Sequence, residues 1–189
     1  MSTINNFYLK RRSVLAKKMQ NHPIKEDDLK TIISAGIRVP DHGALNPWKI
    51  KVIQGQKLKI IDEDIILSEF KRENPNANNE NLEIESKRLQ RASVVLAVIS
   101  TPVEHQKIPN WEMVLSSGAV CMNLLSCAQS LGYAAQWLTE WYVYNNKMLE
   151  YLGGRLDTDR ISGFIYIGHK VEEPKERRRP DPEKVISYI

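Results

Sequence analysis

Guanidinium groups, a hydroxyl and an imidazole occur at places where the sequence could bind a phosphorylated ligand. The first place is Arg11-Arg12-Ser13, which follows the amphipathic run 6–9. Two guanidinium groups beside a hydroxyl can bind a phosphate together with the polar edge of a ring. The alternative is a solvated helix end, because basic side chains also suit helix C-termini. Taken alone, the pattern favours the helix end.

A second candidate is the loop from Arg38 to Trp48, which runs directly into a predicted strand. Two prolines and a glycine restrict its backbone, and it carries the polar side chains of Asp41, His42 and Asn46. A rigid loop that presents donors at a strand edge is a common way to build a ligand site. The alternative is a structural turn in which Trp48 packs in the core and His42 bonds a carbonyl. The pattern does not decide between the two.

Two further segments also allow both a ligand-binding and a purely structural interpretation. In 131–139 a helix is predicted to end and a strand to begin, and small residues there would let a flat group approach the backbone closely. Ordinary core packing uses the same residues. The run Arg177-Arg178-Arg179-Pro180 could clamp a phosphate, although such a run more often marks an exposed basic tail.

Familiar catalytic and metal-binding motifs are missing from the sequence. It contains no glycine-rich phosphate loop, no HExxH and no GxSxG, and its four histidines include no i, i+4 pair. We therefore predict no metal site. Cys121 and Cys127 lie six residues apart on one predicted helix, which is a poor geometry for a disulfide. If the chain is an enzyme, a cofactor must carry its chemistry.

Composition indicates an ordinary globular protein. The chain has 189 residues, of which 42% are hydrophobic and 26% charged, and its formal net charge is +4. We predict one domain over 1–189, in which 172–189, rich in charge and proline, forms an extended C-terminal arm. The N-terminus has no apolar signal segment, and the apolar stretch 113–128 is interrupted and short for a bilayer. We expect a cytoplasmic protein with no membrane partner and, because its basic residues are scattered, no nucleic-acid partner.

Periodicity predicts a sheet with helices on its faces. The stretch 93–100 is a nearly continuous β-branched run, which is typical of a strand covered on both faces. The breaker 74–79 is predicted to be a surface loop between two helices. Together the elements indicate an α+β or α/β fold. The predicted helices are 24–37, 56–70, 79–91 and 111–131, and the predicted strands are 49–54, 93–100, 133–138 and 161–167.

The predicted helix 111–131 is apolar on almost every side. A helix without a polar face must be covered all round. In so short a chain, we expect its covers to be its own sheet and a second subunit. Gly132 suits the position just after the helix cap.

Taken together and in this order, the motifs resemble the nitroreductase superfamily, and in particular its short bacterial members. The resemblance runs from about residue 7 to the C-terminus and rests on Arg11-Arg12-Ser13, on Asp41-His42-Gly43 with Pro47-Trp48, and on 108–119. It implies an α+β nitroreductase-like fold with a central, mixed but mostly antiparallel sheet flanked by helices. It also implies an obligate homodimer that binds FMN non-covalently at its interface.

The resemblance further implies roles for individual residues. Arg11, Arg12 and Ser13 would hold the FMN phosphate and pyrimidine edge, and Arg178 of the tail would add a phosphate contact. Arg38 and His42 would reach the flavin of the second subunit. Trp137, Leu138 and Thr139 would line the ring. The family implies a nicotinamide-nucleotide segment that in this chain consists of Cys127, Ala128, Gln129, Ser130, Leu131 and Gly132.

The resulting hypothesis is an FMN-dependent NAD(P)H oxidoreductase. NADH or NADPH would donate hydride, and a ping-pong cycle would pass it to a nitroaromatic, a quinone or a similar electron-poor acceptor. No side chain is assigned a catalytic role, because the flavin carries the chemistry. The alternatives are an FMN-binding dimer that reduces a non-nitro metabolite, one that sequesters flavin without turnover, and a basic nucleic-acid binder.

Overall fold

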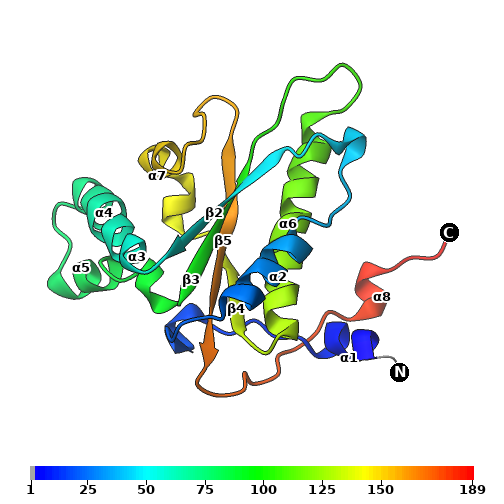
Figure 1. Cartoon of the computed structure of the whole chain (residues 1–189), viewed down its shortest axis with the longest axis horizontal. Helices are drawn as coiled ribbons and strands as arrows, with labels where there is room; N and C mark the ends of the chain where they lie inside the picture. The colour runs from blue at the N-terminus through cyan, green and yellow to red at the C-terminus, as the bar shows by residue number, and fades with distance from the viewer. Residues whose placement is uncertain (1–2) are drawn as a thin grey trace.

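The computed structural model describes residues 3–189, in which helices cover both faces of a five-stranded sheet (Figure 1). The strand order is β1-β5-β3-β2, and β4 also pairs with β5. Each strand pair within 3–189 is antiparallel, which confirms the expected mostly antiparallel α+β fold. The strands are β1 Met19–Gln20, β2 Trp48–Gln54, β3 Val94–Ser100, β4 Ala134–Leu138 and β5 Arg160–Lys170.

The predicted helices occur in the predicted order, and α1, α7 and α8 lie outside the predicted ranges. They are α1 Thr3–Lys10, α2 Glu26–Gly36, α3 Gln56–Ile61, α4 Ser68–Glu73, α5 Asn79–Glu85, α6 Asn110–Ser130, α7 Asn146–Tyr151 and α8 Pro182–Val185.

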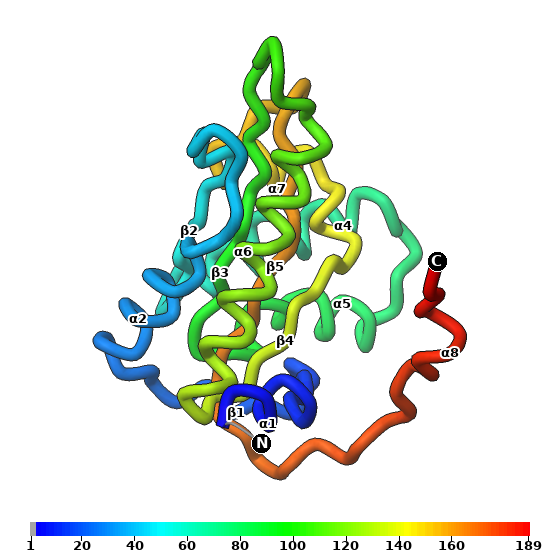
Figure 2. Tube along the Cα trace, turned by 90° about the vertical axis from the view of Figure 1, so that its right-hand side faces the viewer, coloured from blue at the N-terminus to red at the C-terminus, as the bar shows by residue number. Residues whose placement is uncertain are grey.

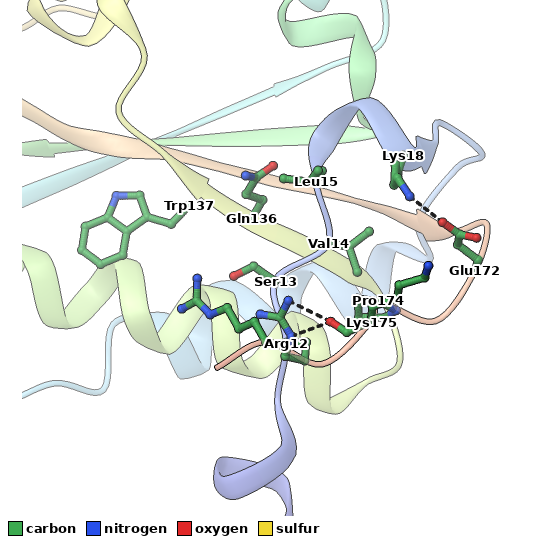
Figure 3. A pocket seen from close by; sticks show the side chains of 11 residues that line it. Arg12, Ser13, Val14, Leu15, Lys18, Gln136, Trp137, Glu172, Pro174 and Lys175 are labelled. Atoms are coloured by element: carbon green, nitrogen blue, oxygen red, sulfur yellow. Dashed lines mark hydrogen bonds and ion pairs between the residues drawn. The ribbon is translucent and has the colours of Figure 1, made fainter. Parts of the chain in front are cut away.

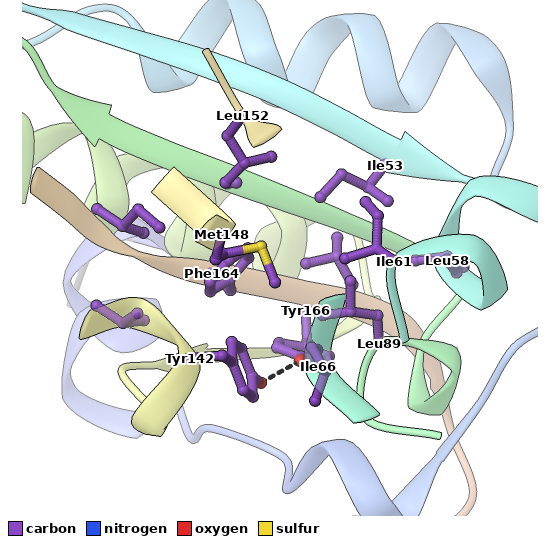
Figure 4. Close-up of a cluster of buried hydrophobic side chains, with 14 of the residues drawn as sticks. Ile53, Leu58, Ile61, Ile66, Leu89, Tyr142, Met148, Leu152, Phe164 and Tyr166 are labelled. Atoms are coloured by element: carbon purple, nitrogen blue, oxygen red, sulfur yellow. Dashed lines mark hydrogen bonds between the residues drawn. The ribbon is translucent and has the colours of Figure 1, made fainter. Parts of the chain in front are cut away.

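Strand β3 lies at the centre of the molecule. All seven of its residues are buried, as its β-branched run predicts. Because side chains alternate along a strand, Val94, Leu96 and Val98 pack toward α2 and α6. Val95 and Ala97 pack on the opposite face, in a second core with α3 and α7 that includes Phe164, Tyr166 and Tyr142 (Figure 4).

Helix α6 is the long apolar helix that the sequence predicts. Its buried face packs on the sheet and α2, while Trp111, Val114 and Leu115 are exposed. The apolar stretch 113–128 is short for a bilayer, but the whole of α6 is long and apolar enough to cross one. Half of its apolar window is, however, buried in the domain. The helix ends at a left-handed Gly132 (φ 90°), and the Tyr133 N–H donates to the Ala128 carbonyl at 3.0 Å. This is the C-terminal motif that a glycine makes possible.

The structure corrects two predicted helices. The stretch 56–73 is helical, but 62–67 form a π-helical turn between α3 and α4 instead of one regular helix. The helix predicted over 79–91 ends at Glu85, and a 3₁₀ turn follows at 89–91. The carboxylate of Asp62 accepts the backbone N–H of Leu89 at 2.7 Å, so that this N–H is not available to continue the helix.

The C-terminal tail extends beyond the sheet. Figure 2 shows it leaving the end of β5 and running along the outside of the fold to α8. Its residues from 175 onward are exposed. Within 172–189 the structure forms the short helix α8, and the other residues of this segment are in neither helix nor strand.

Candidate functional site

A cavity of about 470 Å³ lies between the segment 12–18, strand β4 and the C-terminal tail (Figure 3). It brings together parts of the chain that are more than a hundred residues apart in sequence. Four of the side chains that line it carry positive charge, and an indole lies at one end. The lining residues are Arg12, Ser13, Val14, Leu15, Lys18, Gln136, Trp137, Glu172, Pro174, Lys175 and Arg177.

Hydrogen bonds to α6 and β4 hold the segment 12–18 in place. The Val14 N–H donates to the Ala135 carbonyl at 3.2 Å, and the Ala16 N–H donates to Gln136 Oε1 at 2.6 Å. Gln129 Nε2, in the last turn of α6, donates to the Arg12 carbonyl at 2.8 Å. Arg12 and Ser13 are therefore presented on a backbone that the sheet and α6 fix from two sides.

The tail closes over this segment. Arg12 donates to the Lys175 carbonyl through Nε at 3.2 Å and through Nη2 at 3.0 Å. Lys18 Nζ pairs with Glu172 Oε1 at 2.6 Å, and Arg179 Nη2 donates to the Arg11 carbonyl at 3.4 Å. The tail thus forms one wall of the cavity, with Arg12 directed toward it.

Positive charge is concentrated around the cavity. Burial lowers the pKa of Arg11, and the nearby charges of Arg179, Arg177 and Arg12 lower it further. An anion bound here would relieve this repulsion. Arg11 itself lines a neighbouring hollow and donates to Gln129 Oε1 at 3.3 Å.

Trp137 forms the flat part of the cavity wall. Its Nε1 donates to the Ser162 carbonyl at 3.1 Å. The ring lies against Gly163, where an added Cβ would come within 2.1 Å of Nε1, so that only glycine allows this packing. Leu138 is half-buried and Thr139 is exposed, and neither is among the residues that line the cavity.

The loop that carries Arg38 and His42 does not line the cavity that Arg12 lines, which is called the Arg12 cavity below. His42 Nδ1 contacts Glu112 Oε2 at 2.7 Å in the first turn of α6. Arg12, in contrast, is held by Gln129 at the end of that helix. At about 1.5 Å per residue, Glu112 and Gln129 lie about 25 Å apart along α6. Within one chain, His42 therefore lies away from the Arg12 cavity. Arg38 is exposed, and its carbonyl accepts a hydrogen bond from Asn123 Nδ2 at 2.8 Å.

The predicted nicotinamide segment forms the end of α6 and its cap. Ala128 is fully buried in the core, and Gln129 bridges Arg11, the Arg12 backbone and Ala135. Ser130, Leu131 and Gly132 are exposed. Cys127 and Ser130 line an apolar hollow against α1, apart from the Arg12 cavity. Both cysteine thiols are free, and burial raises the pKa of Cys121 to about 12.

Comparison with known proteins assigns the chain to a family. Residues 8–169 match the model of the Nitroreductase family. The chain belongs to the nitroreductase family. It is 26% identical over 170 residues to "Putative NAD(P)H nitroreductase YdjA" of Escherichia coli K12, covering 86% of this chain and 87% of that protein. It is 27% identical over 177 residues to a similarly named Haemophilus influenzae protein, covering 92% and 93%.

Solved structures of other proteins share this nitroreductase fold. A nitroreductase-like family protein from Bacillus cereus superposes with a TM-score of 0.85 at 23% identity, covering 100% of this chain and 97% of that one. A Bacteroides fragilis nitroreductase with bound FMN superposes with a TM-score of 0.74 at 18% identity, covering 100% of both chains. At these identities the likeness establishes the fold.

Several residues of the nitroreductase cavity were missed by sequence reasoning. Gln136 lies between two apolar neighbours on a predicted strand, and this alternation could have indicated a polar wall. Lys18 and Lys175 gave no local signal. Among the three tail arginines, the described lining includes Arg177, whereas Arg178 was the expected contact. Clusters of three or more possible metal ligands are absent from residues 3–189.

Proposed function

We propose that the chain is an FMN-dependent NAD(P)H oxidoreductase that acts on electron-poor acceptors such as nitroaromatics or quinones. The observation that carries the proposal is the Arg12 cavity, where an anion-binding end and a flat aromatic wall occur in one space. Its volume of about 470 Å³ lies within the range of small-molecule sites. Membership of the nitroreductase family and the FMN-bound relative from Bacteroides fragilis support the same assignment.

The residues present suit the phosphate of FMN. Arg12 and Arg177 supply guanidinium groups at the cavity, and Lys175 and the Ser13 hydroxyl add further donors. Arg12 directs two N–H groups at the Lys175 carbonyl. A phosphate is a stronger acceptor than a peptide carbonyl because charge assists its hydrogen bonds. We infer that binding exchanges this carbonyl for the phosphate.

The opposite end of the cavity suits the ring. Gln136 Oε1 is occupied by the Ala16 N–H, which leaves the amide NH₂ as a donor. A donor at this point would meet a carbonyl of the pyrimidine edge. Trp137 is held flat by Ser162 and Gly163 and would pack beside the ring.

When bound, FMN would supply the redox chemistry of a ping-pong cycle, with NADH or NADPH as the hydride donor and an electron-poor molecule as the acceptor. The protein's side chains bind and orient the reactants and provide positive charge near the pyrimidine edge. The exposed end of α6, at 130–132, is the proposed contact for the nicotinamide nucleotide.

We also propose a homodimer in which the single-domain chain places α6 at the interface. Trp111, Val114 and Leu115 are exposed by 67%, 41% and 53%, and their i, i+3, i+4 spacing puts them on one face. Covering this face with a second copy would bury the apolar surface. It would also allow a second His42 loop to approach the cavity, because within one chain the loop and the cavity contact opposite ends of α6.

The test is the absorbance spectrum of the purified chain. We expect a yellow protein, or one that becomes yellow with added FMN and keeps the colour through desalting. Anaerobic NADH or NADPH should bleach it, and a nitroaromatic or quinone should restore the colour. A chain that stays colourless in excess FMN would refute the proposal. A chain that binds FMN but is bleached by neither nucleotide would instead support flavin sequestration.

A further inference from the structure

We propose that Glu112 is a positioning residue that fixes His42 as the Nδ1–H tautomer, so that Nε2 is presented as a hydrogen-bond acceptor. The inference concerns two residues at the start of α6, remote from the Arg12 cavity. It rests on the proposed function for the ligand that Nε2 meets, which would be the FMN of a second subunit. The contact between the two side chains can be tested without any ligand.

The geometry of the pair determines the tautomer. His42 Nδ1 and Glu112 Oε2 are 2.7 Å apart. A carboxylate only accepts hydrogen bonds, so that Nδ1 must carry the proton. In a neutral imidazole the other nitrogen, Nε2, then has a free lone pair. The partner that Nε2 selects is therefore a donor, and the pyrimidine part of FMN carries one imide N–H.

The same face of α6 also holds the base of the His42 loop. Ser116 lies one turn after Glu112, and its Oγ donates to the Pro40 carbonyl at 2.8 Å. Trp48 Nε1 donates to Ser116 Oγ at 3.2 Å from the other end of the loop. Glu112 and Ser116 thus hold the His42 side chain and the two ends of its loop from a single helix.

The backbone of the loop is strained. Ala44 and Asn46 have φ of 52° and 49°, in the left-handed region that residues with a Cβ rarely adopt. Asp41 Oδ2 accepts the Asn46 N–H at 2.7 Å and maintains this conformation. Strain of this kind is found where a side chain must be held for a ligand.

Stability alone gives little reason for the His42–Glu112 pair. The side chains are exposed by 61% and 44%, and exposed ion pairs contribute little to folding. The contact does, however, fix the orientation of the His42 imidazole ring. We infer that its role is to orient His42 for a ligand.

Two other histidines provide internal references. His105 Nδ1 accepts the N–H groups of Lys107 and Ile108, at 3.2 and 3.1 Å, so that its proton is on Nε2. His169 Nε2 lies 3.2 Å from the Pro23 carbonyl and must donate to it. His42 is therefore expected to have the opposite tautomer from His105 and His169.

The first experiment reads the tautomers from the ring ¹⁵N shifts of the ligand-free chain at mildly alkaline pH, where imidazoles are neutral. We expect Nδ1–H for His42 and Nε2–H for His105. Glu112→Ala removes the acceptor and should shift His42 toward Nε2–H while leaving His105 unchanged. Glu80→Ala, at an exposed glutamate in the first turn of α5, is the matched control and should change neither. An Nε2–H wild-type His42, or one that Glu112→Ala does not alter, overturns the inference.

The second experiment asks whether Glu112 acts through His42, by titrating FMN into Glu112→Ala, His42→Ala and the double variant. We expect Glu112→Ala to weaken FMN binding by about threefold to tenfold, as for one lost hydrogen bond. In the His42→Ala background it should have no further effect. An equal effect in both backgrounds contradicts the positioning role. If the wild type binds no FMN, the proposed function fails, and the NMR result still decides the tautomer.

Discussion

At the scale of single residues, the guanidinium of Arg12 connects the folded tail to the cavity. It donates twice to the Lys175 carbonyl and lies 3.5 Å from Glu176 Oε1. These contacts hold the tail over the site. Because charge-assisted bonds to phosphate are stronger than bonds to a neutral carbonyl, we consider Arg12 the residue at which ligand and tail compete.

Replacing Arg12 should therefore weaken FMN binding. We expect Arg12→Ala to cost about 1.5–3 kcal/mol of binding free energy, the range for a hydrogen bond to a charged group. Arg11→Ala should cost less, because Arg11 lines the neighbouring hollow. Equilibrium titration of FMN fluorescence measures both values. Lys57→Ala, which removes an exposed charge on α3, is the control. Equal affinity of Arg12→Ala and the control would remove Arg12 from the site.

At the scale of elements, α4 and α7 are joined through one buried carboxylate. Glu69 on α4 pairs with Arg72 at 2.9 Å and with Lys147 at 2.8 Å, and it accepts from Asn145 Nδ2 at 3.1 Å. Asn145 in turn caps α7, because its Oδ1 accepts the Met148 N–H at 3.0 Å. The hydrogen bonds from Arg72, Lys147 and Asn145 lower the pKa of Glu69 from 4.5 to about 2.

This shift predicts a loss of stability in acid. Because the pKa is lower in the folded state, Glu69 stabilises the fold above about pH 4.5, and this contribution is lost as the pH falls toward 2. Glu69→Gln should lower the melting temperature at neutral pH and show a shallower decline between neutral pH and pH 3. Thermal unfolding followed by circular dichroism measures both variants. Glu73→Gln, the exposed neighbour that also contacts Arg72, should keep the wild-type slope. Identical slopes in all three proteins would contradict the assignment.

Local sequence signals predicted most elements but not the contacts that end or close them. The run of β3 and the Gly132 cap depend on neighbouring residues, and both were predicted correctly. The early end of α5 depends on Asp62, which is 27 residues from Leu89 in sequence. The candidate site shows the same division. Arg12 and Trp137 were predicted to bind the cofactor, and both line the cavity. Lys175 reaches it only because the tail folds back, which no local pattern specifies.

At the scale of the whole molecule, a single chain leaves an apolar face of α6 exposed and the His42 loop away from the Arg12 cavity. The exposed face of α6 is apolar, and the rigid His42 loop lies beside it at the same end of the helix. The Arg12 cavity lies toward the other end, where Gln129 holds the segment 12–18. A symmetric dimer through α6 would cover the apolar face and place the loop of one copy near the cavity of the other. Its interface would need about 2,000 Å² or more to be obligate.

A charge on the α6 face should separate the subunits. Leu115 is 53% exposed and lines the hollow beside His42, so that Leu115→Glu would bury a carboxylate in the proposed interface. We expect wild type to be a dimer and Leu115→Glu a monomer by size-exclusion chromatography with light scattering. FMN binding should fall in the monomer, because the His42 loop of the second copy is then missing. Leu156→Glu, at an exposed leucine outside α6, should leave both properties unchanged. A wild-type monomer that holds FMN tightly would show that one chain completes the site, and the dimer would then have no part in binding.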